Sequence, residues 1–229
     1  LRHLDRGSGE IDRGQFDGYQ EVFGASGAAM LLSRKTVQCL LLEPGVGADP
    51  LLKIHPQLEP GYDTRPQLFD EAFFAYREDA DLAWRAQRLG VRCRFVPEAI
   101  GYHRRHVLPE LRRQLVGGIN LLSVQNRFLL QLNNVSSILS FRVLLRGLLF
   151  RNFLVLVAVF MREWTSIPAL KRIVILARRA RAVHRMVHAR QVSGERQIAD
   201  WIDVQGRKVA AFGADSASNS VEGNRVISD

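Results

Sequence analysis

The chain has 229 residues, of which 47% are hydrophobic, so it can build a core and is too apolar to be disordered throughout. Its formal net charge of +9 favours a negatively charged partner: nucleic acid, anionic lipid or a phosphorylated substrate. Its two cysteines, Cys39 and Cys93, have no metal-binding spacing and no secretory signal is visible, which together favour a reducing cytosol.

The N-terminal part of the chain predicts short elements joined by loops. Residues 1–19 are polar and rich in glycine, which is typical of a loop. Residues 21–42 predict a strand, a turn of small residues, a second strand and a short helix. Four prolines and three glycines between positions 43 and 65 predict a connecting loop.

A helical pattern starts near Glu78, and Gly90 stands where this helix is expected to end. Its apolar face consists of Leu82, Ala86 and Leu89, which follow the three-and-four spacing. Residues 91–96 alternate between apolar and basic side chains and predict a half-buried strand, and residues 99–103 predict a further short strand.

The composition changes at about residue 138. Residues 108–134 read as helical, with Gly117 and Gly118 as a candidate break. Residues 138–192 predict apolar helices in which eleven basic residues accompany one acid, Glu163. Residues 193–229 form a polar tail that is predicted to be partly disordered. We therefore divide the chain into three parts, residues 1–137, 138–192 and 193–229.

The basic part contains an apolar stripe at helical spacing. The stripe consists of Leu170, Ile173, Val174, Ala177, Ala180, Val183 and Val187. Such a helix can lie in a membrane interface with its arginines among anionic headgroups, pack on the rest of the domain, or bind nucleic acid. We favour an anionic membrane surface because residues 144–161 are also unusually apolar, and we expect no nucleic acid because no recognition module is visible. Arg146 and Arg151 interrupt residues 144–161, so no membrane-spanning helix is predicted.

Three acids, Glu78, Asp79 and Asp81, follow the aromatic run at residues 73–76. Carboxylates in the first turn of a helix are favoured by the helix dipole and can cap free N–H groups. Alternatively, the aromatic side chains wall a carboxylate, restrict water around it and raise its pKa, as a general base requires. From the residues alone, capping is the better interpretation.

Three segments resemble one enzyme family. "FDEAFFAYREDADLAWRAQRLGVRCRFVPEAIGYH" resembles the C-terminal half of the catalytic domain in family 2 glycosyltransferases, which are inverting enzymes of the GT-A fold. "EVFGASGAAMLLSRKTV" resembles the acceptor side of that family, and "SVQNRFLLQLNN" resembles its "NR…L…KN" element. The resemblance covers about residues 14–134 and is closest to the bacterial rhamnosyltransferase-like branch.

The resemblance implies roles for individual residues. Asp79 matches the catalytic base of the family's "ED" motif, and Glu78 matches its partner. Trp84 lies with Asp81 in the "DLAWR" helix, where a structural role is implied, and remains a candidate substrate contact. By its charge and not by the resemblance, Arg77 is a candidate for binding the leaving diphosphate, and a solvated surface charge is the better interpretation of this arginine. The candidate sugar and acceptor loop consists of Gly24, Ala25, Ser26 and Gly27, where small residues let the backbone approach a ligand.

The resemblance also implies a divalent cation, Mg or Mn, on the leaving diphosphate, with His103 as a candidate ligand. The Asp-x-Asp metal motif of the family's first half is missing, because the only such spacing is Asp79-Ala80-Asp81 inside the "ED" motif. We therefore expect an α/β fold that is the C-terminal half of a GT-A (Rossmann-like) domain, followed by a basic amphipathic helical extension. We expect this chain by itself to lack most of the donor site and to be inactive.

The implied function is transfer of a sugar from a nucleotide-sugar donor to a glycan or lipid-linked acceptor in cell-envelope polysaccharide synthesis. The implied location is cytoplasmic, peripheral on the inner face of the membrane. The alternatives are a non-enzymatic membrane-surface adaptor and a nucleic-acid-binding protein.

Overall fold

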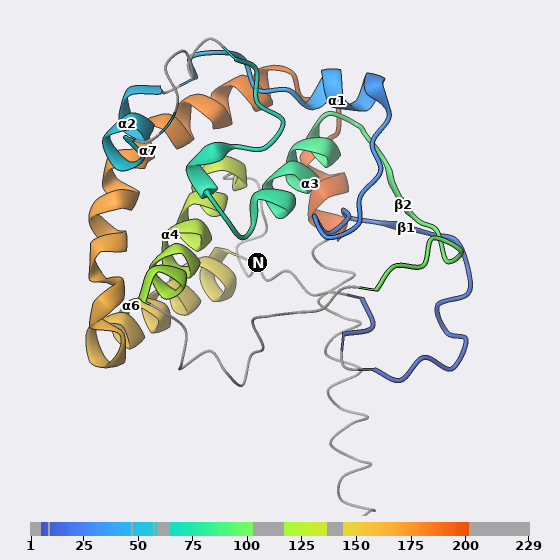
Figure 1. The fold of residues 1–229 in the computed structure, drawn as a ribbon, viewed down its shortest axis with the longest axis horizontal. Coiled ribbons are helices and arrows are strands. Elements are labelled where there is room, and N and C mark those ends of the chain that lie inside the picture. Colours follow the sequence, from blue (N-terminus) through green and yellow to red (C-terminus); the bar gives the residue numbers. More distant parts are fainter. Residues whose placement is uncertain are drawn as a thin grey trace, which may run out of the picture.

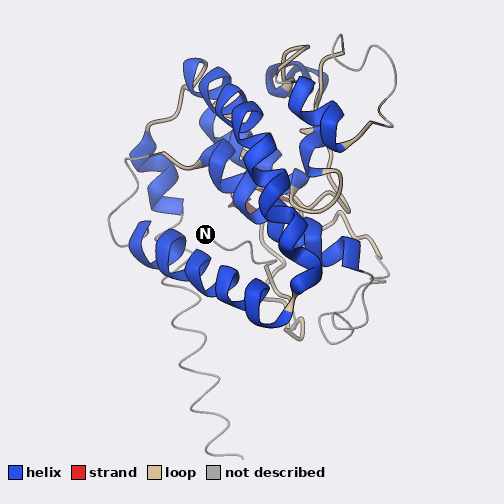
Figure 2. Ribbon diagram, turned by 90° about the vertical axis from the view of Figure 1, so that its left-hand side faces the viewer, coloured by secondary structure: helices blue, strands red, loops and turns tan. Residues whose placement is uncertain are grey.

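The structure is a computed structural model that describes residues 6–8, 10–46, 48–56, 58, 65–102, 117–136 and 144–201. Helices dominate this part of the chain (Figure 2). In chain order the elements are β1 (Gln20–Val22), α1 (Arg34–Leu40), α2 (Ala48–Ile54), the 3-10 turn η2 (Glu71–Phe73), α3 (Glu78–Arg88), β2 (Cys93–Phe95), α4 (Gly117–Asn134), the π-helical segment η4 (Leu144–Phe150), α6 (Arg151–Arg162), the 3-10 turn η5 (Trp164–Ser166) and α7 (Ile167–Ala189).

The helices α4 and α7 pack along each other and form the centre of the molecule. α2 packs on α7, α3 packs on both α4 and α7, and the β1–β2 pair lies at the edge opposite α6 (Figure 1). The main core cluster joins these elements, because it contains Leu51 of α2, Phe73 of η2, Trp84 of α3, Leu129 of α4 and Leu176 of α7. This common core holds the segment around Glu78 and Asp79 between α4 and the N-terminal loops.

The described residues contain one sheet, in which β1 and β2 pair antiparallel with Gln20 opposite Phe95. The strand predicted for residues 91–96 is confirmed, and its alternation is visible in the exposed Arg94 between two half-buried neighbours. The second strand predicted within residues 21–42 is wrong, because Met30 and Leu32 pack on Leu40 and Leu82 without pairing with a strand. The strand predicted for residues 99–103 is absent from its described part, residues 99–102.

Helix α3 forms as its sequence pattern predicts. Leu82 and Leu89 are buried in a cluster with Leu40, and Ala86 packs on the same cluster. The chain leaves the helix through Gly90, whose φ of +73° is favourable only for glycine. The position and end of this helix could therefore be predicted from its spacing alone.

Helix α2 lies where the prolines predicted a connecting loop. Pro50 is in the first turn of α2, where its missing N–H needs no intrahelical partner. Leu51 is 0% exposed in the main core, and this burial stabilises a helix of only seven residues. The predicted loop at residues 43–65 is therefore wrong for residues 48–54.

Helix α7 turns most of its apolar stripe toward the protein and not toward a membrane. Leu176, Ala180, Val183 and Val187 are at most 4% exposed, whereas Val174 is 75% exposed. The interpretation of this stripe as a membrane-interface face is therefore wrong, and the alternative of a helix packed on the domain is confirmed. The spacing of the apolar residues predicted which face of the helix is apolar, but not which surface that face contacts.

Three arginines, Arg85, Arg88 and Arg179, are among the most buried side chains, each at most 1% exposed. Arg88 donates hydrogen bonds to Gln191 and to Glu195, the latter at 2.6 Å. A positively charged composition therefore does not mean that all of the charge is available to a partner.

The tail is ordered at its start. Residues 195–201 are helical, Ile198 is 1% exposed in the main core, and the Trp201 ring packs edge-on against Phe23 at 6.2 Å. The tail is predicted to be only partly disordered, and the stretch to which that prediction applies, residues 213–229, lies outside the described residues.

Helix α6 has one packed face and one open face. Val155 and Val159 pack against Val124 of α4. The other side, which we name the outer apolar face, consists of Leu145, Leu149, Phe150, Phe153, Leu154, Val157, Phe160, Met161 and Trp164, which are 41–73% exposed. Among the described residues, no single helix has the length and apolarity to cross a membrane, and residues 148–162 with residues 164–189 meet that test only as a pair bent by 117°.

Candidate functional site

The turn that leads into α3 has an unusual backbone. Phe74, Tyr76 and Arg77 have φ values of 59°, 70° and 72°, in the left-handed region that bulky residues rarely enter. The Ala75 N–H donates to the Phe73 carbonyl at 2.6 Å, which closes a γ-turn around Phe74. Each such residue costs on the order of 1–3 kcal/mol, so the surrounding structure must hold this turn in place.

Two amide side chains of α4 stabilise this turn. Asn126 is 0% exposed, and its side-chain nitrogen donates to the carbonyl oxygens of Phe73, Ala75 and Tyr76 at 2.8, 2.7 and 2.8 Å. The Gln125 side chain donates to the Ala72 carbonyl at 3.2 Å. One buried helix therefore fixes the strained turn, and the turn fixes where α3 begins.

Asp79 lies in the first turn of α3, and backbone donors orient its carboxylate. Its Oδ2 accepts a hydrogen bond from the Gly27 N–H at 3.0 Å, and its Oδ1 accepts one from the Ala80 N–H at 2.7 Å. Each oxygen keeps a second lone pair with which it can accept a proton. The structure thus brings the predicted catalytic base and the predicted substrate loop together.

The small residues of that loop serve two different purposes. A Cβ on Gly24 would lie 2.1 Å from the Ala83 Cβ, so glycine is needed there for packing on α3 and not for approach to a ligand. A Cβ on Gly27 would lie 3.5 Å from the Asp79 Cβ, in ordinary contact. Ala25 and Ser26 lie between them, half-buried and exposed respectively. Gly27 is therefore the loop residue in direct contact with the acid.

Glu78 differs from Asp79 in its environment. Burial, with the neighbouring charge of Asp79 as a further cause, raises the pKa of Glu78. Its Oε2 is buried without a hydrogen-bond partner in the described structure. A carboxyl group with a raised pKa and an unpaired oxygen suits a residue that binds or positions a hydroxyl group.

The aromatic run before the acids does not form one wall. Phe73 is 0% exposed and belongs to the core, whereas Phe74 and Tyr76 are 66% and 44% exposed. The ring of His55 stacks on Phe74 with centroids 5.4 Å apart. The prediction of a wall is therefore wrong for Phe73, and Phe74 and Tyr76 remain as exposed aromatic surface in the turn before the acids.

Trp84 is not placed to contact a substrate. It is 5% exposed in the main core, where Phe23 packs edge-on against it at 5.2 Å. Its assignment as a substrate-binding residue is corrected to a packing residue beneath the site. Arg77 is half-buried and is the residue before α3, which places its backbone next to Glu78.

Asp81 anchors a buried polar network and is not a helix cap. Its carboxylate accepts hydrogen bonds from Arg85 at 3.2 Å, Asn133 at 3.1 Å and Asn134 at 2.7 Å. Asn133 also donates to Asp70, and Asp70 pairs with Arg179 at 2.8 Å. The network ties α3, α4 and α7 together beneath the acids.

The described residues contain no group of three or more His, Cys, Asp or Glu side chains that could hold a metal ion. The divalent cation stays a prediction. The candidate ligand His103 lies outside the described residues. The metal-binding role of His103 therefore stays a prediction.

A family model described as "Glycosyl transferase family group 2" matches residues 8–178. The chain belongs to glycosyl transferase family group 2. Membership makes it a nucleotide-sugar glycosyltransferase in general terms, with a donor and an acceptor as substrates, and implies a GT-A-like α/β domain. No curated protein and no solved structure matches the chain.

The family match runs through the strained turn, the Asp79 site and most of the helical part, to residue 178. Within it, sequence reasoning missed the residues that position the acids, namely Asn126, Asn133 and Asn134. The signal was present in the segment "SVQNRFLLQLNN", because amides on an otherwise apolar helix need buried partners.

We expect Asn126→Ala to impair both folding and activity of this glycosyltransferase. Loss of the hydrogen bonds that the two N–H groups of this amide share among three carbonyl oxygens should lower the free energy of unfolding by about 2–4 kcal/mol. Turnover should also fall at a temperature where the variant is folded, because the turn no longer fixes the start of α3. Urea denaturation and a sugar-transfer assay measure the two effects.

Asn152→Ala is the matched control, because Asn152 is hydrogen-bonded to Gln131 and Arg127 away from the turn. It should lose stability without a comparable loss of turnover. Equal turnover in the two folded variants would contradict the role of Asn126 in positioning Asp79.

Proposed function

We propose that the protein transfers a sugar with inversion and that Asp79 is its general base. The observation that carries the proposal is the double backbone anchoring of the Asp79 carboxylate at the start of α3, with Gly27 on one side. Membership of the family supports the reaction class. The exposed rings of Phe74 and Tyr76, a few residues before the acid, offer apolar surface for the faces of sugar rings.

In the proposed reaction, an acceptor hydroxyl oxygen forms a bond to the anomeric carbon of the donor. The bond from that carbon to the diphosphate oxygen breaks, and the nucleoside diphosphate leaves with the electron pair. Asp79 takes the proton of the attacking hydroxyl group, and Glu78 orients the acceptor. The single in-line displacement inverts the anomeric configuration.

We further propose a glycan or lipid-linked acceptor, cell-envelope polysaccharide synthesis and a location on the inner face of the membrane. The outer apolar face supports the membrane location, because an exposed apolar surface of this extent is typical of an interaction site. The resemblance of the three sequence segments to the family is the support for a divalent cation, for a donor-binding half beyond this chain and for the rhamnosyltransferase-like branch.

A sugar-transfer assay on the full-length protein in detergent tests the reaction. The donors are a panel of nucleotide-sugars with magnesium or manganese, and NMR of the purified product reports the anomeric configuration. We expect transfer from one donor with inversion. Retention of configuration would contradict direct displacement with Asp79 as base, and absence of transfer from every donor would contradict the proposed activity.

A further inference from the structure

A hollow between α4, the η4–α6 segment and α7 has two chemically different sides. Its apolar wall consists of Phe128, Leu132, Leu148 and Ile173, and its basic rim of Arg178, Arg181 and Arg185. We name it the amphipathic hollow. The three arginines of its rim are exposed on α7, in contrast to the buried Arg179 of the same helix.

The amphipathic hollow has positive charge without compensation. None of its lining residues is acidic, and none of the three rim arginines forms an ion pair within the described part of the chain. Next to it, Arg127 is 7% exposed, and its Nε–H group donates to Asn152, which lines the hollow. Its Nη2 has no hydrogen-bond partner among the described residues. Burial, and to a smaller extent the nearby charge of Arg151, lower the pKa of Arg127.

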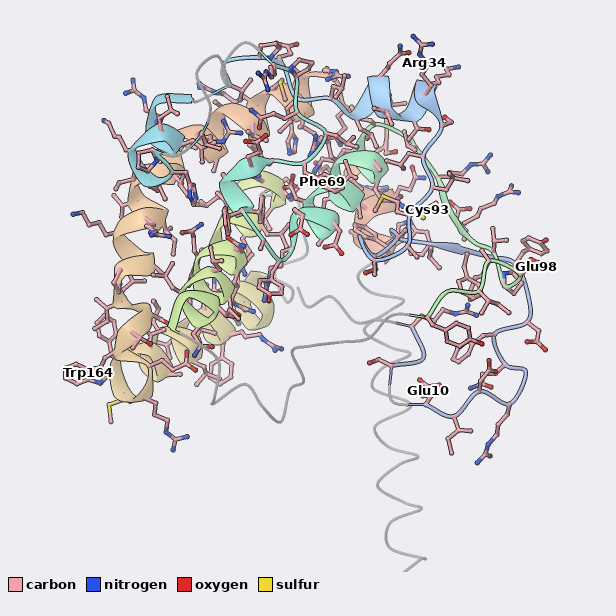
Figure 3. The ribbon with its side chains drawn as sticks, viewed as in Figure 1. Glu10, Arg34, Phe69, Cys93, Glu98 and Trp164 are labelled. Atoms are coloured by element: carbon pink, nitrogen blue, oxygen red, sulfur yellow. The ribbon has the colours of Figure 1, made fainter. Side chains whose placement is uncertain are left out.

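The amphipathic hollow and the outer apolar face share the η4–α6 segment. Leu148 lines the hollow, and its neighbours Leu145, Leu149 and Phe150 line a separate, shallow hollow on the outer face together with Phe153. Trp164, at the bend between α6 and α7, is 71% exposed and points away from the molecule (Figure 3). An amphipathic ring at such an edge is typical of a membrane interface.

We propose that the amphipathic hollow binds an anionic phospholipid. The phosphate lies against Arg178, Arg181 and Arg185, an acyl chain follows the apolar wall, and the outer apolar face enters the same leaflet. Charge complementarity selects this occupant, because phosphate satisfies unpaired guanidinium groups and the wall beside them is hydrocarbon. The inference extends the proposed membrane location and does not depend on sugar transfer.

Vesicle co-sedimentation of the full chain, without donor or acceptor, tests this proposal. The vesicles are pure phosphatidylcholine or phosphatidylcholine with phosphatidylglycerol. The test variant combines Arg178→Gln, Arg181→Gln and Arg185→Gln. The matched control removes the same charge with Arg34→Gln, Lys35→Gln and Arg92→Gln, which are exposed positions outside the hollow, with Arg34 on the side opposite Trp164 (Figure 3).

We expect the wild type to prefer the anionic vesicles and the test variant to bind them roughly 100-fold more weakly, since each basic residue near an anionic surface contributes about a factor of five. The control should stay within roughly threefold of the wild type, because Arg34, Lys35 and Arg92 line neither the amphipathic hollow nor the shallow hollow of the outer apolar face. Equal weakening of the two variants, or equal binding of the wild type to neutral vesicles, would overturn the proposal.

Two further experiments distinguish a bound phospholipid from other ligands that carry phosphate. Inorganic phosphate at millimolar concentration and single-stranded DNA should leave vesicle binding unchanged at constant ionic strength. Displacement by either would identify a different ligand and overturn the proposal.

Brominated acyl chains should quench the Trp164 fluorescence, and Trp164→Phe should remove most of the quenching. Unquenched wild-type fluorescence in bound samples would rule out insertion of the outer apolar face. A protein that fails these tests but transfers sugar in detergent would contradict the phospholipid site and leave the proposed sugar transfer intact.

Discussion

Asp79→Asn in the full-length protein should lower turnover by at least about 100-fold, the loss typical of removing a general base. Asparagine keeps the shape of the side chain and a carbonyl oxygen that can accept the Gly27 N–H, so the loop contact at 3.0 Å can persist. What disappears is the capacity to take a proton from the acceptor hydroxyl group. The kcat of sugar transfer should therefore fall while the free energy of unfolding changes little.

Two variants make this expectation specific. Asp200→Asn changes an exposed acid of the C-terminal segment and should leave turnover unchanged. Glu78→Gln should act mainly on the KM for the acceptor, because the raised pKa of Glu78 suits a group that positions a hydroxyl and not one that must be ionised. If Asp79→Asn retains near-normal turnover, another group is the base and the assignment is wrong.

Arg179→Met should lower the free energy of unfolding by about 3–5 kcal/mol, the cost of breaking a buried ion pair. Arg179 is 1% exposed and donates two hydrogen bonds to the Asp70 carboxylate, at 2.8 and 3.2 Å, with a further bond to Gln67 at 3.2 Å. Its removal leaves Asp70 as a buried charge without its main partner. Urea denaturation at pH 7 measures the loss.

The loss of stability in Arg179→Met should depend on pH, because Asp70 titrates. Burial would raise the pKa of Asp70, but the charge of Arg179 and its hydrogen bonds outweigh that effect and hold the pKa below the usual range. The wild type therefore gains stability from this group above the unfolded-state pKa of about 4 and loses it as the pH falls below that value. Without Arg179, burial raises the pKa of Asp70. Protonation of Asp70 then removes the unpaired buried charge and reduces the loss of stability of the variant. The difference in stability should shrink between pH 7 and about pH 4.

Lys171→Met is the control for this variant, because Lys171 is exposed on the same helix, and it should change stability by less than about 0.5 kcal/mol. The double variant Arg179→Met/Asp70→Leu should recover much of the loss, since replacing both members of a buried pair with apolar residues is often nearly neutral. A pH-independent loss, or no recovery in the double variant, would show that packing and not the ion pair determines the cost. The same buried network explains why Asp81 is not a helix cap.

The sequence by itself determined the local elements whose patterns repeat within a few residues. The spacing of Leu82 and Leu89 and the stop at Gly90 gave α3, and alternation gave β2. The order of "FFAYRED", "DLAWR" and "QNR" was specific enough to indicate the family, which the match over residues 8–178 shows. These signals are local because helix and strand periods depend only on the residues of one segment.

Only the tertiary structure decided which surface each pattern faces. The stripe of α7 has the periodicity of a membrane-interface helix, yet it packs on α2 and α4, while the outer apolar face on η4 and α6 is left open. Asp79 and Asp81 are two residues apart in one helical turn, yet one contacts a loop 52 residues away and the other is buried among amides of α4. A helix turns successive residues by about 100°, so neighbours in sequence face different partners, and those partners come from distant segments that no short pattern specifies.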